Sequence, residues 1–253
     1  MLRRRVIPSL LLSGSGLVKT RKFRKPVYVG DPINAVKIFN EKEVDELFLI
    51  DIHASRERRG PNFALVESIV SEAFMPVAYS GGVRSYEDVR TLLRLGVEKV
   101  ALNTTALDDL KLVRELSNAF GVQCIVGVVD VKRDFFGRAK VWSHAGRTPH
   151  ETDPRRWMQA LVEAGAGELL VQSVDRDGTL DGLDLDLLAS LKGAVNVPVV
   201  AAGGARDERD LKAAFDLGYG AVAVGAKFVF IGPHRAVLIS YLSDAERLAL
   251  QLT

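Results

Sequence analysis

The sequence predicts an α/β fold, a (β/α)8 or TIM barrel that forms a single domain over residues 1–253. Three observations lead to this prediction. The chain has 253 residues, close to the roughly 250 that one such barrel needs. Eight short apolar runs recur along it, each followed by a stretch with helical periodicity. The spacing of the runs also repeats once, which indicates two half-barrels, about residues 1–122 and 123–253.

Composition excludes several other classes of protein. Hydrophobic residues make up 47% of the chain, too many for a disordered protein, and a single cysteine cannot form a disulfide scaffold. The 34 basic and 32 acidic residues leave a net charge of +2, which argues against a general binder of nucleic acid or membranes. No apolar run reaches the roughly 18 residues of a transmembrane helix, and the N-terminus lacks a good signal peptide. We therefore expect a cytoplasmic protein.

The eight apolar runs are the expected barrel strands, in order along the chain. Nearly continuous apolar strands of this kind suit a parallel sheet that is covered on both faces. The runs are Val6–Leu12, Leu47–Ile52, Val77–Tyr79, Val100–Asn103, Cys124–Val131, Leu169–Ser173, Val199–Ala202 and Val222–Gly225.

The segments between the runs carry helix signals. Asp31 followed by proline gives an N-cap and a favoured first helical residue, so a helix is expected from Asp31 to Lys42. The segments Tyr86–Leu95 and Asp207–Leu217 are amphipathic, and each is followed by a glycine at the position of a helix C-cap. Strands that alternate with helices in this way favour a parallel barrel.

The repeat has a period of 122 residues. The expected strand starts are spaced by 41, 30 and 23 residues in the first half and by 45, 30 and 23 in the second. The glycine pair Gly81-Gly82 recurs at this offset as Gly203-Gly204. Four parallel strands alone leave two bare edges, so the halves are expected to close into one barrel. An open doubly wound sheet is the alternative, but it would not require such twofold spacing.

Both glycine pairs follow a strand and precede a helix. In a barrel this position lies on the C-terminal face, where ligands bind. Glycines let backbone N–H groups approach an anion closely, and a helix N-terminus favours negative charge. The pairs therefore predict a phosphorylated small molecule as ligand, although simple turn glycines are the alternative. The candidate phosphate-binding residues are Gly81, Gly82, Thr104, Gly203, Gly204, Gly225 and Ala226.

Charged residues near the strand ends are the other candidates for a site. Asp130 ends the fifth run and is the candidate catalytic residue, or else a carboxylate that anchors a loop. Asp177 follows the sixth run and is either a substrate contact or part of a charged turn. The segment Lys19–Lys25 holds five basic residues in seven and is expected to be a loop. It either draws a phosphorylated ligand, with Lys19 in contact, or is simply solvated.

Metal and cofactor sites are not expected. The histidines show no metal-ligand spacing with one another or with Cys124, which we expect to be a small core residue. No P-loop or complete dinucleotide fingerprint is present. The histidines are His53, His144, His150 and His234.

Seven stretches carry a family resemblance: Arg5-Val6-Ile7-Pro8, Gly16-Leu17-Val18-Lys19, Gly30-Asp31-Pro32, Asp45-Glu46-Leu47, Ser80-Gly81-Gly82-Val83-Arg84, Asp175-Arg176-Asp177-Gly178-Thr179 and Ala202-Gly203-Gly204-Ala205. Together they resemble the cyclase subunit of imidazole glycerol phosphate synthase, HisF, over essentially the whole chain. The resemblance implies a barrel that receives ammonia from a glutaminase subunit (HisH-like) docked on its N-terminal face. The ammonia then passes along the barrel axis to a phosphorylated substrate at the opposite face.

The resemblance also assigns residues to the two ends of the barrel. Family members carry a ring of charges at the ammonia entrance and two catalytic aspartates, at the ends of strands one and five. The second aspartate matches Asp130, but Leu11 stands at the first position, and leucine cannot exchange a proton. Ala226 likewise stands where a phosphate-binding hydroxyl is expected. The entrance, or ammonia gate, is matched by Arg5, Glu46, Lys99 and Glu168, for which a structural salt-bridge layer is the alternative.

A retained entrance beside an altered site resembles the HisF-like paralogues of acetamidino sugar modification in surface-polysaccharide biosynthesis. This likeness implies a subunit that supplies ammonia to an acetamido-sugar amidotransferase. The alternative is an active cyclase of histidine biosynthesis, in which Asp130, Lys19 and Asp177 compensate for Leu11. A nucleic-acid binder is disfavoured by the net charge of +2. The stretches that carry the likeness are Leu10-Leu11-Leu12, 16–20, 28–47 and 234–239.

Overall fold

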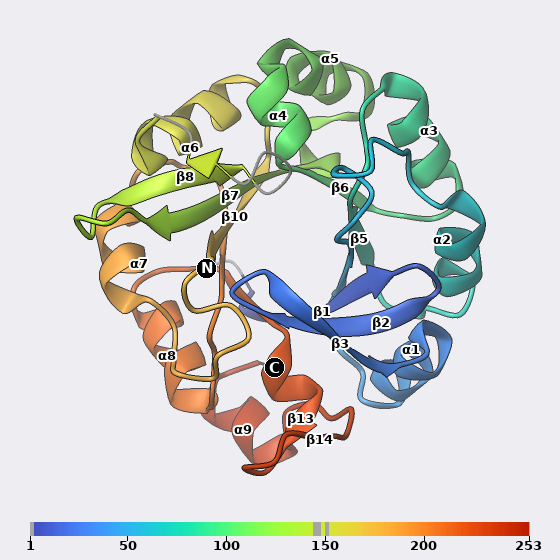
Figure 1. The fold of residues 1–253 in the computed structure, drawn as a ribbon, viewed down its shortest axis with the longest axis vertical. Coiled ribbons are helices and arrows are strands. Elements are labelled where there is room, and N and C mark those ends of the chain that lie inside the picture. The colour runs from blue at the N-terminus through green and yellow to red at the C-terminus, as the bar shows by residue number, and fades with distance from the viewer. Residues whose placement is uncertain (1–2, 144–147, 150–151, 253) are drawn as a thin grey trace.

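The computed structural model describes residues 3–143, 148–149 and 152–252, and it contains the predicted barrel (Figure 1). Eight parallel strands follow one another around a ring, and pairing of the first strand with the last closes it. The eight predicted strands are confirmed to within one or two residues at most ends. They are β1 (Arg5–Ser13), β4 (Leu47–Asp51), β5 (Val77–Ser80), β6 (Lys99–Leu102), β7 (Ile125–Arg133), β10 (Glu168–Ser173), β11 (Val199–Ala202) and β12 (Ala221–Val224).

Helices form an outer ring around these strands (Figure 1). The expected start of the first helix is confirmed, because the Asp31 side chain accepts a hydrogen bond from the N–H of Asn34. Ser85 caps the third helix in a capping box with Asp88. The helices are α1 (Pro32–Glu41), α2 (Phe63–Val70), α3 (Tyr86–Arg94), α4 (Thr104–Asp108), α5 (Leu110–Phe120), α6 (Pro154–Glu163), α7 (Leu185–Leu191), α8 (Glu208–Asp216) and α9 (Asp244–Ala249).

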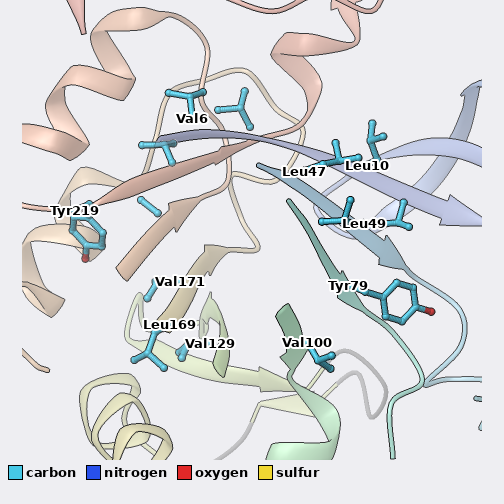
Figure 2. Packing of buried hydrophobic residues seen from close by; sticks show 14 of the residues in the cluster. Val6, Leu10, Leu47, Leu49, Tyr79, Val100, Val129, Leu169, Val171 and Tyr219 are labelled. Carbon is cyan, nitrogen blue, oxygen red and sulfur yellow. The ribbon is translucent and has the colours of Figure 1, made fainter. Parts of the chain in front are cut away.

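The strands separate two layers of core. Side chains that point outward, such as Leu47 and Leu49 on β4 and Leu169 and Val171 on β10, pack under the helices (Figure 2). Alternate residues belong to a second cluster, as the two-residue period of a strand requires. Five of its eleven buried members are alanine, so the barrel interior is filled less than one lined with large branched residues. The interior residues are Ile7, Phe48, Ala78, Ala101, Val126, Val128, Leu170, Val200, Ala202, Ala221 and Ala223.

Two antiparallel hairpins extend the barrel at its C-terminal end. In the first half, β1 continues into β2 (Gly16–Arg21) and β3 (Arg24–Gly30); in the second, β7 pairs with β8 (Ala139–Ser143), which pairs with β9 (Thr148–Pro149). The expectation of a loop over Lys19–Lys25 is wrong. The segment is a hairpin that turns at Lys22 and Phe23, both in the left-handed region with φ of 54° and 57°.

Smaller elements complete the chain. They are the 3-10 helices η1 (Val122–Cys124) and η2 (Ala226–Phe228) and the short hairpin of β13 (Phe230–Ile231) and β14 (Ala236–Val237). Cys124 ends η1 and is half-buried, so the expectation of a core cysteine on a strand is wrong. In the part of the chain that the structure describes, no helix has the length and apolar character needed to cross a bilayer.

Candidate functional site

Four charged residues meet at the N-terminal end of the barrel. Arg5, Lys99 and Glu168 each begin a strand, and Glu46 directly precedes β4. The Arg5 guanidinium donates to the carboxylates of both Glu46 and Glu168. The Lys99 ammonium lies 3.0 Å from both Glu46 oxygens and 2.8 Å from Glu168. The result is a closed ring in which bases and acids alternate, and we call it the floor ring.

The floor ring is electrically balanced. The side chains of Glu46 and Glu168 are only 6% and 9% exposed, whereas those of Arg5 and Lys99 are 21% exposed. Burial alone would raise the pKa of Glu168, but the charges of Lys99 and Arg5 hold it below its ordinary value. Each buried carboxylate therefore has two cationic partners, the condition under which buried charge is tolerated.

A cavity of about 590 Å³ opens at the opposite, C-terminal end. Its base is largely apolar and includes Leu11, Phe48 and Leu170. Both hairpins border it, through Phe23 between β2 and β3 and Trp142 on β8. A volume of this size lies within the range of small-molecule sites in proteins.

Asp130 lies on β7 in the wall of this cavity and is 6% exposed. Its carboxyl accepts a hydrogen bond of 3.2 Å from the side-chain amide of Asn103. Burial, and secondarily the nearby charge of Asp177, raise the pKa of Asp130 to about 8. The group is therefore mainly protonated at neutral pH and able to give or take a proton there.

The other two charged candidates, Lys19 and Asp177, lie close to each other but are engaged with the backbone and with β2. Lys19 lies on β2 with its ammonium donating to the carbonyl of Ser9, and burial lowers its pKa to about 8 against the opposing effect of Asp177. Asp177 accepts from the hydroxyl of Thr20 at 2.8 Å and from the N–H of Phe23 at 3.2 Å. Asp177 thus anchors the β2–β3 hairpin over the mouth.

The two glycine pairs occupy equivalent places in the halves. A Cβ at Gly81 would lie 2.4 Å from the carbonyl oxygen of Asp51, and one at Gly203 would lie 2.5 Å from that of Ser173. These φ angles, 120° and 101°, also favour glycine. Close backbone packing therefore explains the pairs in part, whether or not an anion binds.

The surroundings of the two pairs differ. In the first half, Gly81, Gly82 and Thr104 line the large cavity. In the second, the equivalent residues line a recess of only about 50 Å³, which also contains Lys19. The residues of this recess include Gly203, Gly204, Gly225 and Ala226.

Two contacts in and beside the cavity had no signal in the sequence. Lys132 lies over the ring of Trp142, 4.2 Å from its centroid, because β7 and β8 form a hairpin that was not predicted. Arg59 forms a two-pronged contact with Asp51, at 2.8 and 2.9 Å, which fixes the loop after β4. Neither contact follows from local periodicity.

The structure offers no candidate metal centre among the residues that it describes. His53 lines the cavity and His234 lies in the β13–β14 hairpin. His144 and His150 lie outside the described residues.

The fold and this site define a (β/α)8 barrel protein with a ligand cavity at its C-terminal face and a charged ring at the other end. The profile of the histidine biosynthesis protein family matches residues 5–232. The chain therefore belongs to that family, within it to the HisF-like subunits of imidazole glycerol phosphate synthase type.

Relatives from three organisms support this membership, and their provisional names all describe an imidazole glycerol phosphate synthase subunit of the HisF kind. Subunit hisF2 of Pseudomonas aeruginosa is 51% identical over 242 residues, covering 95% of this chain and 96% of the relative. Subunit hisF3 of Vibrio vulnificus is 42% identical over 249 residues, covering 98% and 96%. The HisF subunit of Leptospira interrogans is 40% identical over 252 residues, covering 99% of both.

Proposed function

We propose that this chain is the synthase-type subunit of a glutamine amidotransferase complex. It conducts ammonia from a glutaminase subunit at the N-terminal face, through the barrel, to the C-terminal mouth. The ammonia serves the acetamidino modification of a nucleotide-linked sugar in surface-polysaccharide (lipopolysaccharide O-antigen) biosynthesis. One observation carries the proposal: the floor ring is complete, whereas Leu11 lines the mouth where the cyclase family has its first catalytic aspartate.

The interior of the barrel supports a conduit. Alanines at five inward positions leave less side-chain volume along the axis than large branched residues would. We infer that Arg5, Glu46, Lys99 and Glu168 form the gate through which ammonia enters. A small uncharged molecule is suited to such a path, because an apolar interior stabilises it better than an ion.

The residues at the mouth indicate that cyclase activity is weak or absent. Cyclisation in the family uses two carboxyl groups, and removal of one acid–base group lowers a rate by roughly 10² to 10⁴. Asp177 does not replace the missing group, since one of its oxygens accepts from Thr20 and the N–H of Phe23 and the other accepts from the side-chain amide of Gln172. We infer that Asp130 is a remaining proton-transfer group and that the glycine pairs, with Thr104, Gly225 and Ala226, are the remnants of phosphate sites.

A second candidate function, an active cyclase of histidine biosynthesis, is favoured by a specific observation. Burial brings the pKa values of both Asp130 and Lys19 to about 8, so two groups at the mouth exchange protons near neutral pH. In this alternative the ammonium of Lys19 takes the part of the missing aspartate.

One experiment separates the two candidates. The purified barrel is mixed with its glutaminase, and glutamine hydrolysis is measured beside turnover of the histidine-pathway intermediate with ammonia. The conduit predicts stimulated glutamine hydrolysis and no formation of imidazole glycerol phosphate; robust formation of that product would overturn it. The variant Leu11→Asp tests whether the missing carboxyl group is the reason for inactivity. If it is, the variant is expected to gain cyclase activity.

A further inference from the structure

The tip of the β7–β8 hairpin exposes two aromatic rings. Phe135 is 98% exposed and Phe136 is 77% exposed, and their rings stand edge to face with centroids 5.6 Å apart. Neither ring lines the cavity. At about 3.3 Å per strand residue, the tip lies roughly 16 Å beyond Asp130 along β7. These rings therefore serve neither the core nor a small ligand in the cavity.

The tip is held in one conformation by its own hydrogen bonds. Asp134 accepts from the N–H groups of Phe136 and Arg138, at 2.9 and 3.0 Å, and from the Arg138 guanidinium at 2.8 Å. Gly137 takes the left-handed φ of 78° that the turn requires. Asp134 and Gly137 thus build the turn through the backbone, and the Phe136 ring adds one contact with the Arg138 guanidinium, 5.2 Å from the ring centroid.

The base of the hairpin is fixed to the rim of the barrel. The guanidinium of Arg133 pairs with Asp184, the N-cap of α7, at 3.0 Å, and its N–H donates to Asp175 at 2.8 Å. Figure 1 shows the turn between β7 and β8 reaching the outer edge of the helix ring near α7. Aromatic rings carried on a hydrogen-bonded turn offer a large contact area with few rotatable bonds, which is a property of interface anchors.

The charge around the C-terminal mouth indicates the kind of surface that would bind there. Four cavity-lining cations on the rim, namely Lys22, Arg24, Lys25 and Arg56, are exposed and take part in no ion pair within the described ranges. The three cavity carboxylates do not balance them, because Asp51 is paired with Arg59, Asp130 is buried, and Asp177 is bound by Thr20, Phe23 and Gln172. The mouth therefore presents a surplus of positive charge around the opening, and the aromatic tip lies farther out on the same face, at the outer edge of the helix ring (Figure 1).

We propose that Phe135 and Phe136 anchor a second protein that covers the mouth with an acidic surface and takes the two rings into an apolar pocket. This inference rests on the proposed function, since a conduit delivers ammonia without loss only if the enzyme that consumes it seals the exit. The occupant is thus the ammonia-consuming amidotransferase. The rings supply affinity, while the rim cations supply orientation and the rate of encounter.

The test measures binding of the purified acetamido-sugar amidotransferase to the complex of this barrel with its glutaminase. The double variant F135S/F136S is expected to weaken binding at least tenfold, about 1.4 kcal/mol. Its melting temperature is expected to stay unchanged, because the rings are exposed. The matched control is Leu248→Ser on α9, 71% exposed on the outer helix ring, with affinity within about twofold of the parent.

The remaining outcomes are decisive as well. Unchanged affinity of the double variant, or no binding by the parent barrel, would overturn the docking site. Binding that does not weaken with added salt would overturn the acidic surface. A concentration-dependent dimer of the barrel that the double variant abolishes would assign the tip to a second copy instead. Glutaminase stimulation, measured in the same preparation, reports on the conduit separately: its loss contradicts the proposed function, whereas its persistence with failed docking contradicts only this inference.

Discussion

The floor and the mouth of the barrel differ in how their charged side chains are paired. At the floor, two acids and two bases satisfy one another in a closed ring. At the mouth, Asp130 faces an apolar cavity base that includes Leu11, and exposed cations line the opening without ion-pair partners among the described residues. The floor therefore balances its charges within the chain, whereas the mouth keeps a surplus of positive charge.

The largest expected effect lies at the floor. Glu168→Gln leaves Arg5 and Lys99 to share Glu46, so one cation is left uncompensated. We expect a loss of about 3–5 kcal/mol in the free energy of unfolding, measured with urea at neutral pH. Because the pKa of Glu168 lies below its ordinary value, the wild-type advantage is present at neutral pH and is lost as the pH falls through the folded-state pKa.

The control for this prediction is a surface pair. Glu72 lies 3.6 Å from Lys37, and the two side chains are 45% and 56% exposed. Glu72→Gln is expected to cost less than about 1 kcal/mol. Equal losses for the two variants would show that the floor ring is no more than an ordinary surface network.

A smaller effect, with a different pH dependence, is expected at the mouth. The folded-state pKa of Asp130 is raised to about 8, so the folded protein binds more protons than the unfolded chain between about pH 4 and 8. Wild-type stability attributable to this group therefore falls as the pH rises through that window. Asp130→Asn removes this pH dependence. The free energy of unfolding of the variant should therefore rise relative to that of wild type by about 2–4 kcal/mol from pH 5 to pH 8.

Thermal unfolding of both proteins across the same pH series checks this expectation. Asp186→Asn, which removes an exposed carboxyl group in the first turn of α7, serves as the control. A pH-independent difference for Asp130→Asn would contradict the buried, protonated state of this carboxyl group.

The smallest effect on stability concerns Lys19. Its contribution to the free energy of unfolding rises with pH, whereas that of Asp130 falls. The folded-state pKa of Lys19 is lowered to about 8, so burial of the cation is costly below pH 8, and the cost is relieved between pH 8 and about 10.5. Lys19→Met should be more stable than wild type at pH 7 by about 1–3 kcal/mol, with a gain that shrinks toward pH 10. Chemical denaturation at the two pH values measures it, with the exposed Lys111→Met as control. A gain that grows with pH would be inconsistent with a buried ammonium.

The sequence predicted the barrel well because strand and helix signals are local. Apolar runs such as Leu47–Ile52 are buried on both faces, and Asp31 caps a helix through a residue three positions away. The repeat of Gly81 as Gly203 located the C-terminal ends of equivalent strands in both halves. The division into half-barrels near residue 122 stays a prediction.

The hairpins and the state of the site could not be predicted in this way. The turn at Lys22 and Phe23 adopts left-handed angles without glycine or asparagine, so it has no turn signal. Asp177 holds that turn from 154 residues away, a contact that exists only in the closed barrel. The charged segment around Lys19 therefore resembled a solvated loop, although the Lys19 side chain is buried.

The composition of the floor ring has a consequence for the order of folding. Arg5, Glu46 and Lys99 come from the first half of the chain, and Glu168 comes from the second. The seam of the barrel likewise pairs Arg5 with Ala221, so its closure joins residues very distant in sequence. An isolated first half would hold two cations beside one carboxylate. The complete ring can therefore form only after the two halves of the chain have met.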